Sequence, residues 1–194
     1  AVIGFSLGGH IALRFAHEAN QDRALAVVSV CPPLCLRGCQ EALDGPALNA
    51  YRFNIIRSLK ARYRVIQRNG EQTGTPVLAS KAGLQAVDSI YAWDQTTVVP
   101  RFGFGSVENY YREVSAGPIL PAINLKSLVV MARHDPMIPF RTVETYLNNA
   151  SENCEVVVVD RGGHLGFPKD LSLGFNGHPG LENQIAAWLA QALA

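Results

Sequence analysis

The sequence predicts an α/β fold in which a mostly parallel sheet is flanked by helices and interrupted by a helical insertion. Four short runs rich in β-branched residues are the predicted strands, at 1–4, 24–30, 127–132 and 154–160. These runs are apolar throughout instead of alternating, as expected for strands that are covered on both faces. Three helical patterns follow strands, at 7–19, 142–150 and 181–193. Strand–helix alternation of this kind is typical of a parallel sheet.

The stretch 35–125 departs from that alternation. It holds a basic, aromatic amphipathic segment at 47–67, a polar connection after it, and further helical patterns at 82–93 and 106–115. We therefore expect one domain over residues 1–194, with 35–125 inserted as a helical cap over the C-terminal ends of the strands. A longer helical crossover between two strands is the alternative interpretation.

The first residues read as the end of a buried strand, because Ala1-Val2-Ile3 has neither an initiator Met nor a polar lead-in. Strands usually run about 5–6 residues. We therefore expect this strand to begin upstream, and the chain to be the C-terminal part of a truncated α/β domain.

The composition is that of a globular protein, with 48% apolar and 17% charged residues among 194. Lys and Arg number 17 against 16 Asp and Glu, for a net charge of +1. This balance gives no reason to expect nucleic acid or an anionic membrane as a partner. No apolar run approaches the roughly 20 residues of a transmembrane helix. We expect a small-molecule or lipid-like partner, and the sequence does not indicate an oligomeric state.

Three of the four cysteines, Cys31, Cys35 and Cys39, recur at every fourth residue, and the fourth is Cys154. A metal site is one interpretation of that spacing. Zinc sites more often join a Cys pair to a second pair or to two His, and neither lies nearby. We expect reduced, partly buried thiols, no metal or cofactor, and a reducing compartment such as the cytoplasm.

The strongest motif is Gly4-Phe5-Ser6-Leu7-Gly8, which fits G-x-S-x-G between a predicted strand and a predicted helix. In that context the serine lies on a strained turn that exposes its hydroxyl, and the two glycines leave room for neighbouring chain. Ser6 is the candidate nucleophile. The backbone N–H of Leu7, at the helix N-terminus, is the candidate oxyanion donor.

A serine hydroxyl needs a base, and the base needs an orienting carboxylate. On this type of sheet their order along the chain is serine, acid, histidine. Asp135 follows the predicted strand 127–132, and His164 follows the strand 154–160 in a glycine-rich loop. Both stand at C-terminal ends of strands, where ligands of open parallel sheets bind.

Other residues compete for these roles less well. His10 and His17 fall within the first predicted helix, His134 adjoins Asp135, and His178 follows no strand. Asp160 is the alternative acid, but it lies only four residues before His164. The acid normally comes from the preceding strand.

Five segments together resemble the YheT-like branch of the α/β-hydrolases, which is related to the lipid-acting ABHD hydrolases. The segments are GFSLGG at 4–9, VCPPLCL at 30–36, DQTTVVPRFGFGSVENYYREVS at 94–115, ARHDPMIP at 132–139 and GGHLGF at 162–167. Cys35 and His134 stand where relatives often have Asp. The resemblance implies that Ser6, Asp135 and His164 are nucleophile, acid and base. It also implies a second oxyanion donor from a loop that precedes the serine in the family fold.

The resemblance implies a serine hydrolase that cleaves short-chain, medium-chain or lipid-like carboxylic esters. Apolar residues of the insertion are candidates for lining such a site or, equally, for an ordinary core: Tyr51, Phe53, Ile90, Tyr91, Trp93, Phe102 and Phe104. Two alternatives remain open. The same three residues serve an acyltransferase, and a truncated chain is also compatible with an inactive binding module.

Overall fold

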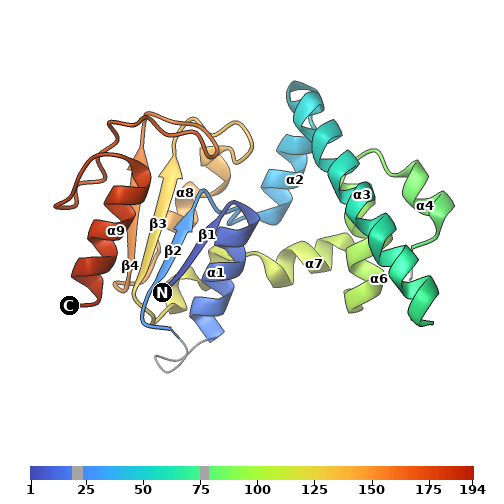
Figure 1. Ribbon diagram of the computed structural model, residues 1–194, viewed down its shortest axis with the longest axis horizontal. Helices are drawn as coiled ribbons and strands as arrows, with labels where there is room; N and C mark the ends of the chain where they lie inside the picture. Colours follow the sequence, from blue (N-terminus) through green and yellow to red (C-terminus); the bar gives the residue numbers. More distant parts are fainter. Residues whose placement is uncertain (19–23, 75–78) are drawn as a thin grey trace. The chain divides into compact units, whose positions relative to one another are not determined.

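The computed structural model describes residues 1–18, 24–74 and 79–194. It confirms the α/β fold class. Four strands form one parallel sheet in the order β1-β2-β3-β4 (Figure 1). They are β1 (Val2–Phe5), β2 (Val27–Val30), β3 (Ser127–Ala132) and β4 (Cys154–Val159). Because all four run the same way, the residues that follow them meet at one edge of the sheet.

Burial explains why the strand sequences are apolar without alternation. Every residue of β2 and of β3 is buried, so both faces of these central strands are covered. β1 lies at the edge of the described sheet, and its Val2, Ile3 and Phe5 side chains are exposed.

The chain forms two compact units, and the first contains the sheet. It comprises Ala1–Cys39 and Ser115–Ala194. The helix α1 (Leu7–Glu18) packs against β1 and β2 through a buried side that includes Leu13 and Ala16. The helix α9 (Leu181–Ala192) lies along β4, where Trp188 Nε1 donates a hydrogen bond to Glu155 Oε2 at 2.7 Å. Residue 19, the last of the predicted first helix, lies outside the described residues.

The predicted helix over 142–150 is largely wrong. The structure has a 3-10 turn, η4 (Phe140–Thr142), followed by the single helical turn α8 (Glu144–Leu147). Thr142 Oγ1 donates to the carbonyl of Pro139 at 2.7 Å, and Asn149 Nδ2 donates to the carbonyl of Thr145 at 2.7 Å. Side chains that bond to nearby backbone in this way compete with a longer helix. A further 3-10 segment, η3 (Gly117–Ala122), leads into β3.

The second unit, Gln40–Val114, is shorter at both ends than the predicted range 35–125. Its described residues form helices and connections, with no strand among them. The elements are the end of α2 (Leu36–Asp44), η1 (Pro46–Leu48), α3 (Asn49–Thr73), α4 (Lys81–Ala86), α5 (Ile90–Trp93), the π-helical turn η2 (Asp94–Val98), α6 (Val99–Phe102) and α7 (Val107–Val114). Its placement as a cap over the strand ends stays a prediction.

Two helix boundaries in this unit differ from expectation. The polar segment after residue 67 continues α3 to Thr73, with Gly70 among its buried residues, and the helix ends at Gly74, whose φ of 67° is left-handed. The predicted helix 82–93 is broken in two. Ser80 and Ser89 cap α4 and α5 separately, each accepting a backbone N–H on its side chain.

A small core and a carboxylate network hold the second unit together. Trp93 packs edge-to-face on Tyr63 with ring centroids 5.8 Å apart. Asp44 accepts the first two N–H groups of α5, and Tyr111 donates its hydroxyl to Asp94 at 2.7 Å. Burial raises the pKa of Asp94 to about 6, against the opposing effect of that hydrogen bond. Across residues 1–18, 24–74 and 79–194, no helix combines the length and apolar character needed to cross a membrane.

Candidate active site

Ser6 occupies the sharp turn between β1 and α1. Its φ is 52°, a left-handed value that costs a non-glycine residue about 1–2 kcal/mol. The turn is held on both sides: Ser6 N–H donates to the carbonyl of Val30 at 2.8 Å, and the N–H of His10 donates to the carbonyl of Ser6 at 3.1 Å. The strained residue therefore has one fixed orientation, at the C-terminal end of the sheet.

The glycines around Ser6 differ in what they do. A Cβ at Gly4 would lie 2.2 Å from the carbonyl oxygen of Gly8, so a side chain cannot fit there. At Gly9 a Cβ would lie 2.7 Å from Ser29 Oγ, whereas one at Gly8 meets no described atom within 4 Å. The expectation that both glycines of the motif make room is thus wrong for Gly8. Gly9 provides the second close approach instead.

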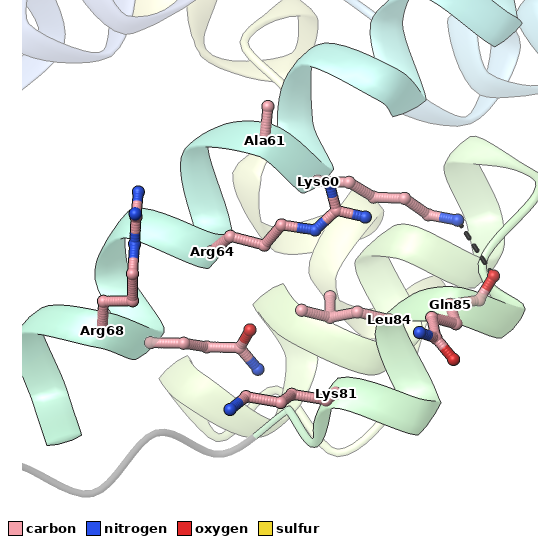
Figure 2. Close-up of a pocket in the computed structure, with 8 residues that line it drawn as sticks. Lys60, Ala61, Arg64, Arg68, Lys81, Leu84 and Gln85 are labelled. Carbon is pink, nitrogen blue, oxygen red and sulfur yellow. Dashed lines mark hydrogen bonds between the residues drawn. The ribbon is translucent and has the colours of Figure 1, made fainter.

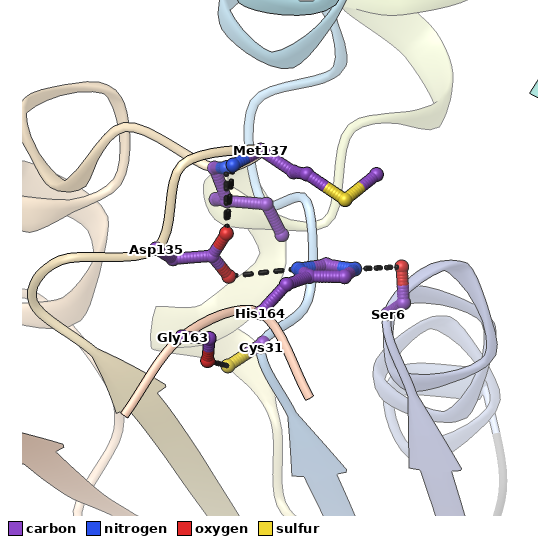
Figure 3. Close-up of polar contacts among 7 residues, drawn as sticks. Ser6, Cys31, Asp135, Met137, Gly163 and His164 are labelled. Carbon is purple, nitrogen blue, oxygen red and sulfur yellow. Dashed lines mark hydrogen bonds and ion pairs between the residues drawn. The ribbon is translucent and has the colours of Figure 1, made fainter. Parts of the chain in front are cut away.

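Asp135 follows β3 and is 4% exposed. Its Oδ1 accepts hydrogen bonds from the backbone N–H groups of Met137 at 2.8 Å and Ile138 at 3.1 Å. These bonds fix the carboxylate and leave Oδ2 to face His164, whose Nδ1 lies 2.8 Å away (Figure 3). The Asp135 carboxylate is therefore held in one orientation by three hydrogen bonds.

His164 lies in the loop after β4 and joins the other two residues. Its Nε2 is 2.7 Å from Ser6 Oγ, so the three side chains form one hydrogen-bonded chain within the first unit (Figure 3). The loop is held by a bond from Gly163 N–H to the carbonyl of Gly166 at 2.9 Å. Gly162 has a φ of 136°, which requires glycine, and a Cβ there would approach Phe167 to 2.9 Å.

The structure does not bring the competing residues into this chain. His10 is buried in α1, with Nδ1 3.1 Å from the carbonyl of Pro33. Asp160 is exposed and accepts a hydrogen bond from Arg133 Nε at 2.7 Å. The remaining histidines, His17, His134 and His178, are exposed and form no part of the chain.

Cys31 is a neighbour of this site that the sequence interpretation missed. It follows β2, is fully buried, and is the second non-glycine residue with a left-handed φ, 46°. Its thiol points towards the carbonyl of Gly163 at 4.0 Å (Figure 3). Burial, with the charge of Asp135, raises the pKa of the Cys31 thiol to about 12, so it stays protonated. The sequence feature that could have identified Cys31 is its position directly after a strand, which it shares with Ser6.

The four cysteines are free thiols. Burial also raises the pKa of Cys154 to about 11 and that of Cys39 further. Metal ligation requires the thiolate. Among the residues that the structure describes, no group of three or more His, Cys, Asp or Glu is arranged to hold a metal ion.

A parallel sheet that carries a serine at a strand-to-helix turn, with an acid and a histidine at later strand ends, is the arrangement of the α/β hydrolases. The sequence pattern that defines the alpha/beta hydrolase fold family matches residues 1–171. The chain therefore belongs to this family.

The relatives confirm the resemblance to the YheT and ABHD branch. YheT of Escherichia coli (strain K12) is 28% identical over 196 residues, which is 100% of this chain and 55% of YheT. The Homo sapiens protein named monoacylglycerol lipase ABHD2 is 27% identical over 177 residues, which is 86% of this chain and 42% of the lipase. The chain thus spans about half the length of these relatives. Among solved structures, the Pyrococcus furiosus esterase Pf2001 is 15% identical with a TM-score of 0.42, covering 84% of this chain and 44% of that one.

Proposed function

We propose that this chain carries the catalytic residues of a serine hydrolase that cleaves carboxylic esters through an acyl-serine intermediate. The observation that supports this most is the hydrogen-bonded chain from Ser6 Oγ through His164 to Asp135, with 2.7 Å and 2.8 Å between successive partners. Both distances fall in the range expected for a nucleophile and its base, and for a base and its orienting acid.

The fixed carboxylate assigns a role to each nitrogen of the imidazole. Nδ1–H donates to Asp135, which leaves Nε2 with a lone pair facing the Ser6 hydroxyl. As Oγ bonds to the ester carbonyl carbon, Nε2 takes the hydroxyl proton. The imidazolium then gives this proton to the departing alcohol as the carbon–oxygen bond breaks. Water repeats the two steps on the acyl-serine, releasing the acid and restoring Ser6.

The negative charge that develops on the carbonyl oxygen needs nearby donors. Leu7 is the first residue of α1, and the N–H groups of a helix's first turn have no acceptor within the helix. We assign the Leu7 N–H as an oxyanion donor. The positive end of the α1 dipole supports the same charge.

The relatives support a proposal for the substrate class. A monoacylglycerol is a carboxylic ester of a fatty acid, and the human relative is named for its cleavage. We propose short-chain, medium-chain or lipid-like esters for this chain. Of the apolar residues considered for the insertion, Tyr51, Phe53 and Phe102 are exposed, whereas Trp93 packs on Tyr63.

The test compares this chain with its Ser6→Ala variant on p-nitrophenyl butyrate and octanoate. Ser58→Ala is the matched control, because Ser58 is an exposed serine on α3. Loss of the nucleophile costs about 10⁶ in kcat in a comparable triad enzyme. We expect Ser6→Ala to lose turnover and fluorophosphonate labelling, and Ser58→Ala to keep both. If the chain hydrolyses either ester, equal rates and equal labelling for the chain and Ser6→Ala would refute the assignment. Product analysis with an added alcohol separates hydrolysis from acyl transfer.

A further inference from the structure

A basic cleft lies between α3 and α4 in the second unit, with a volume of about 480 Å³ (Figure 2). This volume falls within the range of about 300–1,000 Å³ that small-molecule sites occupy. All the ionisable residues that line the cleft are cations: Lys60, Arg64 and Arg68 on α3, and Lys81 on α4.

The walls of the cleft are tied together at three places. In the middle, the buried Gln67 donates from Nε2 to the carbonyl of Ala79 at 2.9 Å. At one end Lys60 Nζ donates to the carbonyl of Gln85 at 3.0 Å, and at the other Lys81 pairs with Glu71 at 3.0 Å. One buried contact and two exposed contacts therefore join the two walls of the cleft.

Two guanidinium groups between these ties have no partner among the residues that the structure describes. Arg64 and Arg68 are exposed on successive turns of one face of α3, and neither makes a hydrogen bond or ion pair to a residue that the structure describes. Lys60, Arg64 and Arg68 stand four residues apart, a spacing at which like charges destabilise a helix. A bound anion would remove that repulsion.

We propose that this cleft binds the phosphate group of a small phosphomonoester or of a lipid headgroup, with Arg64 and Arg68 as the principal ligands. The planar guanidinium groups match the oxygens of a phosphate and donate paired, charge-assisted hydrogen bonds. Lys60 adds positive charge at one end, whereas Lys81 at the other end is already paired with Glu71. The cleft is larger than a bare phosphate requires, so the organic part of the ligand has room beside Leu84 on its floor. The site is independent of the proposed ester hydrolysis.

The experiment measures binding by the intact chain with isothermal titration calorimetry and vesicle sedimentation. The soluble probes are inorganic phosphate and glycerol 3-phosphate. The vesicles contain phosphatidylcholine with or without phosphatidic acid, whose headgroup is a phosphomonoester. The variant is Arg64→Gln with Arg68→Gln. Its control is Arg57→Gln with Arg62→Gln, which removes the same charge from exposed positions of α3 outside the cleft. Glutamine keeps a similar helix propensity in both.

We expect saturable binding that weakens at least about tenfold in the cleft variant and less than about threefold in the control, since charged hydrogen bonds are lost only in the first. Loss confined to the soluble probes identifies a free phosphomonoester as the ligand. Loss confined to phosphatidic acid vesicles identifies a lipid headgroup. Equal weakening in both double variants, or no saturable binding to any probe, would overturn the proposal.

Discussion

Replacing Asp135 by asparagine tests how the acid sets the imidazole tautomer. Oδ1 of Asp135 accepts two backbone N–H groups, from Met137 and Ile138, and these demand an acceptor. In the Asp135→Asn variant the amide oxygen must therefore take that position, which places the NH₂ group where Oδ2 now faces His164 Nδ1 at 2.8 Å. A donor at this point favours the imidazole with Nδ1 unprotonated and Nε2 protonated. That tautomer cannot accept the proton of Ser6.

The loss should be large while the fold is retained. In a comparable triad the same exchange lowers kcat about 10⁴-fold, which corresponds to roughly 5 kcal/mol of transition-state stabilisation. The assay is steady-state hydrolysis of p-nitrophenyl butyrate at neutral pH, with circular dichroism to check folding. The matched control is Asp160→Asn, because that exposed carboxylate pairs with Arg133 and not with His164.

We expect Asp160→Asn to change the rate by less than about threefold, as surface ion pairs contribute little. If folded Asp135→Asn kept more than a tenth of the activity, the tautomer reasoning would be refuted. If Asp160→Asn showed the large loss instead, the acid would be Asp160.

Two further predictions concern stability. Gly4→Ala should destabilise the chain by at least about 1–3 kcal/mol, because the added Cβ would meet the Gly8 carbonyl oxygen at 2.2 Å. Gly8→Ala should be neutral or stabilising by up to about 1 kcal/mol. Urea unfolding of both variants measures the two effects, and equal effects would contradict the prediction. Burial raises the pKa of Asp94 from 3.8 to about 6, so the folded chain holds this proton more tightly than the unfolded one. Its protonated form stabilises the fold below about pH 4, and that contribution falls by roughly 2–3 kcal/mol as the pH rises past 6. Asp94→Asn keeps an acceptor for Tyr111. Its free energy of unfolding, compared with that of the parent chain, should therefore rise by roughly 2–3 kcal/mol between pH 4 and pH 7. If the difference in free energy of unfolding between variant and parent were the same at both pH values, Asp94 would ionise normally.

The sequence predicted best what depends on strand ends. A strand is recognised by a short apolar run, and in a parallel sheet the end of each run points to the same edge. Together with the G-x-S-x-G motif and the chain order serine, acid, histidine, those two facts selected Ser6, Asp135 and His164 over four other histidines and a competing aspartate, and the structure brings these three together. Their catalytic roles remain the proposal that the experiments above address.

Helix boundaries and supporting residues depended on contacts that the sequence does not reveal. Gly70 looked like part of a connection, but it is a buried residue within α3. Gly8 looked structural because of the motif, yet the close approaches are made at Gly4 and Gly9. Cys31 was taken with two other cysteines as a spacing pattern, when its significance lies in its backbone and its neighbours.

The two left-handed non-glycine residues show how the sheet itself orients the site. Ser6 and Cys31 each follow a strand, and each donates its N–H to the next strand, to Val30 and to Val130, at 2.8 Å. The parallel ladder thus extends one residue beyond β1 and β2 and holds the strained angles in place. Strain of this kind persists only where the surroundings fix it. Ser6, Asp135 and His164 all belong to the first unit, so the hydrogen-bonded chain is set by the sheet and its strand-end loops. Substitutions in the second unit should therefore leave the distances among Ser6, His164 and Asp135 unchanged.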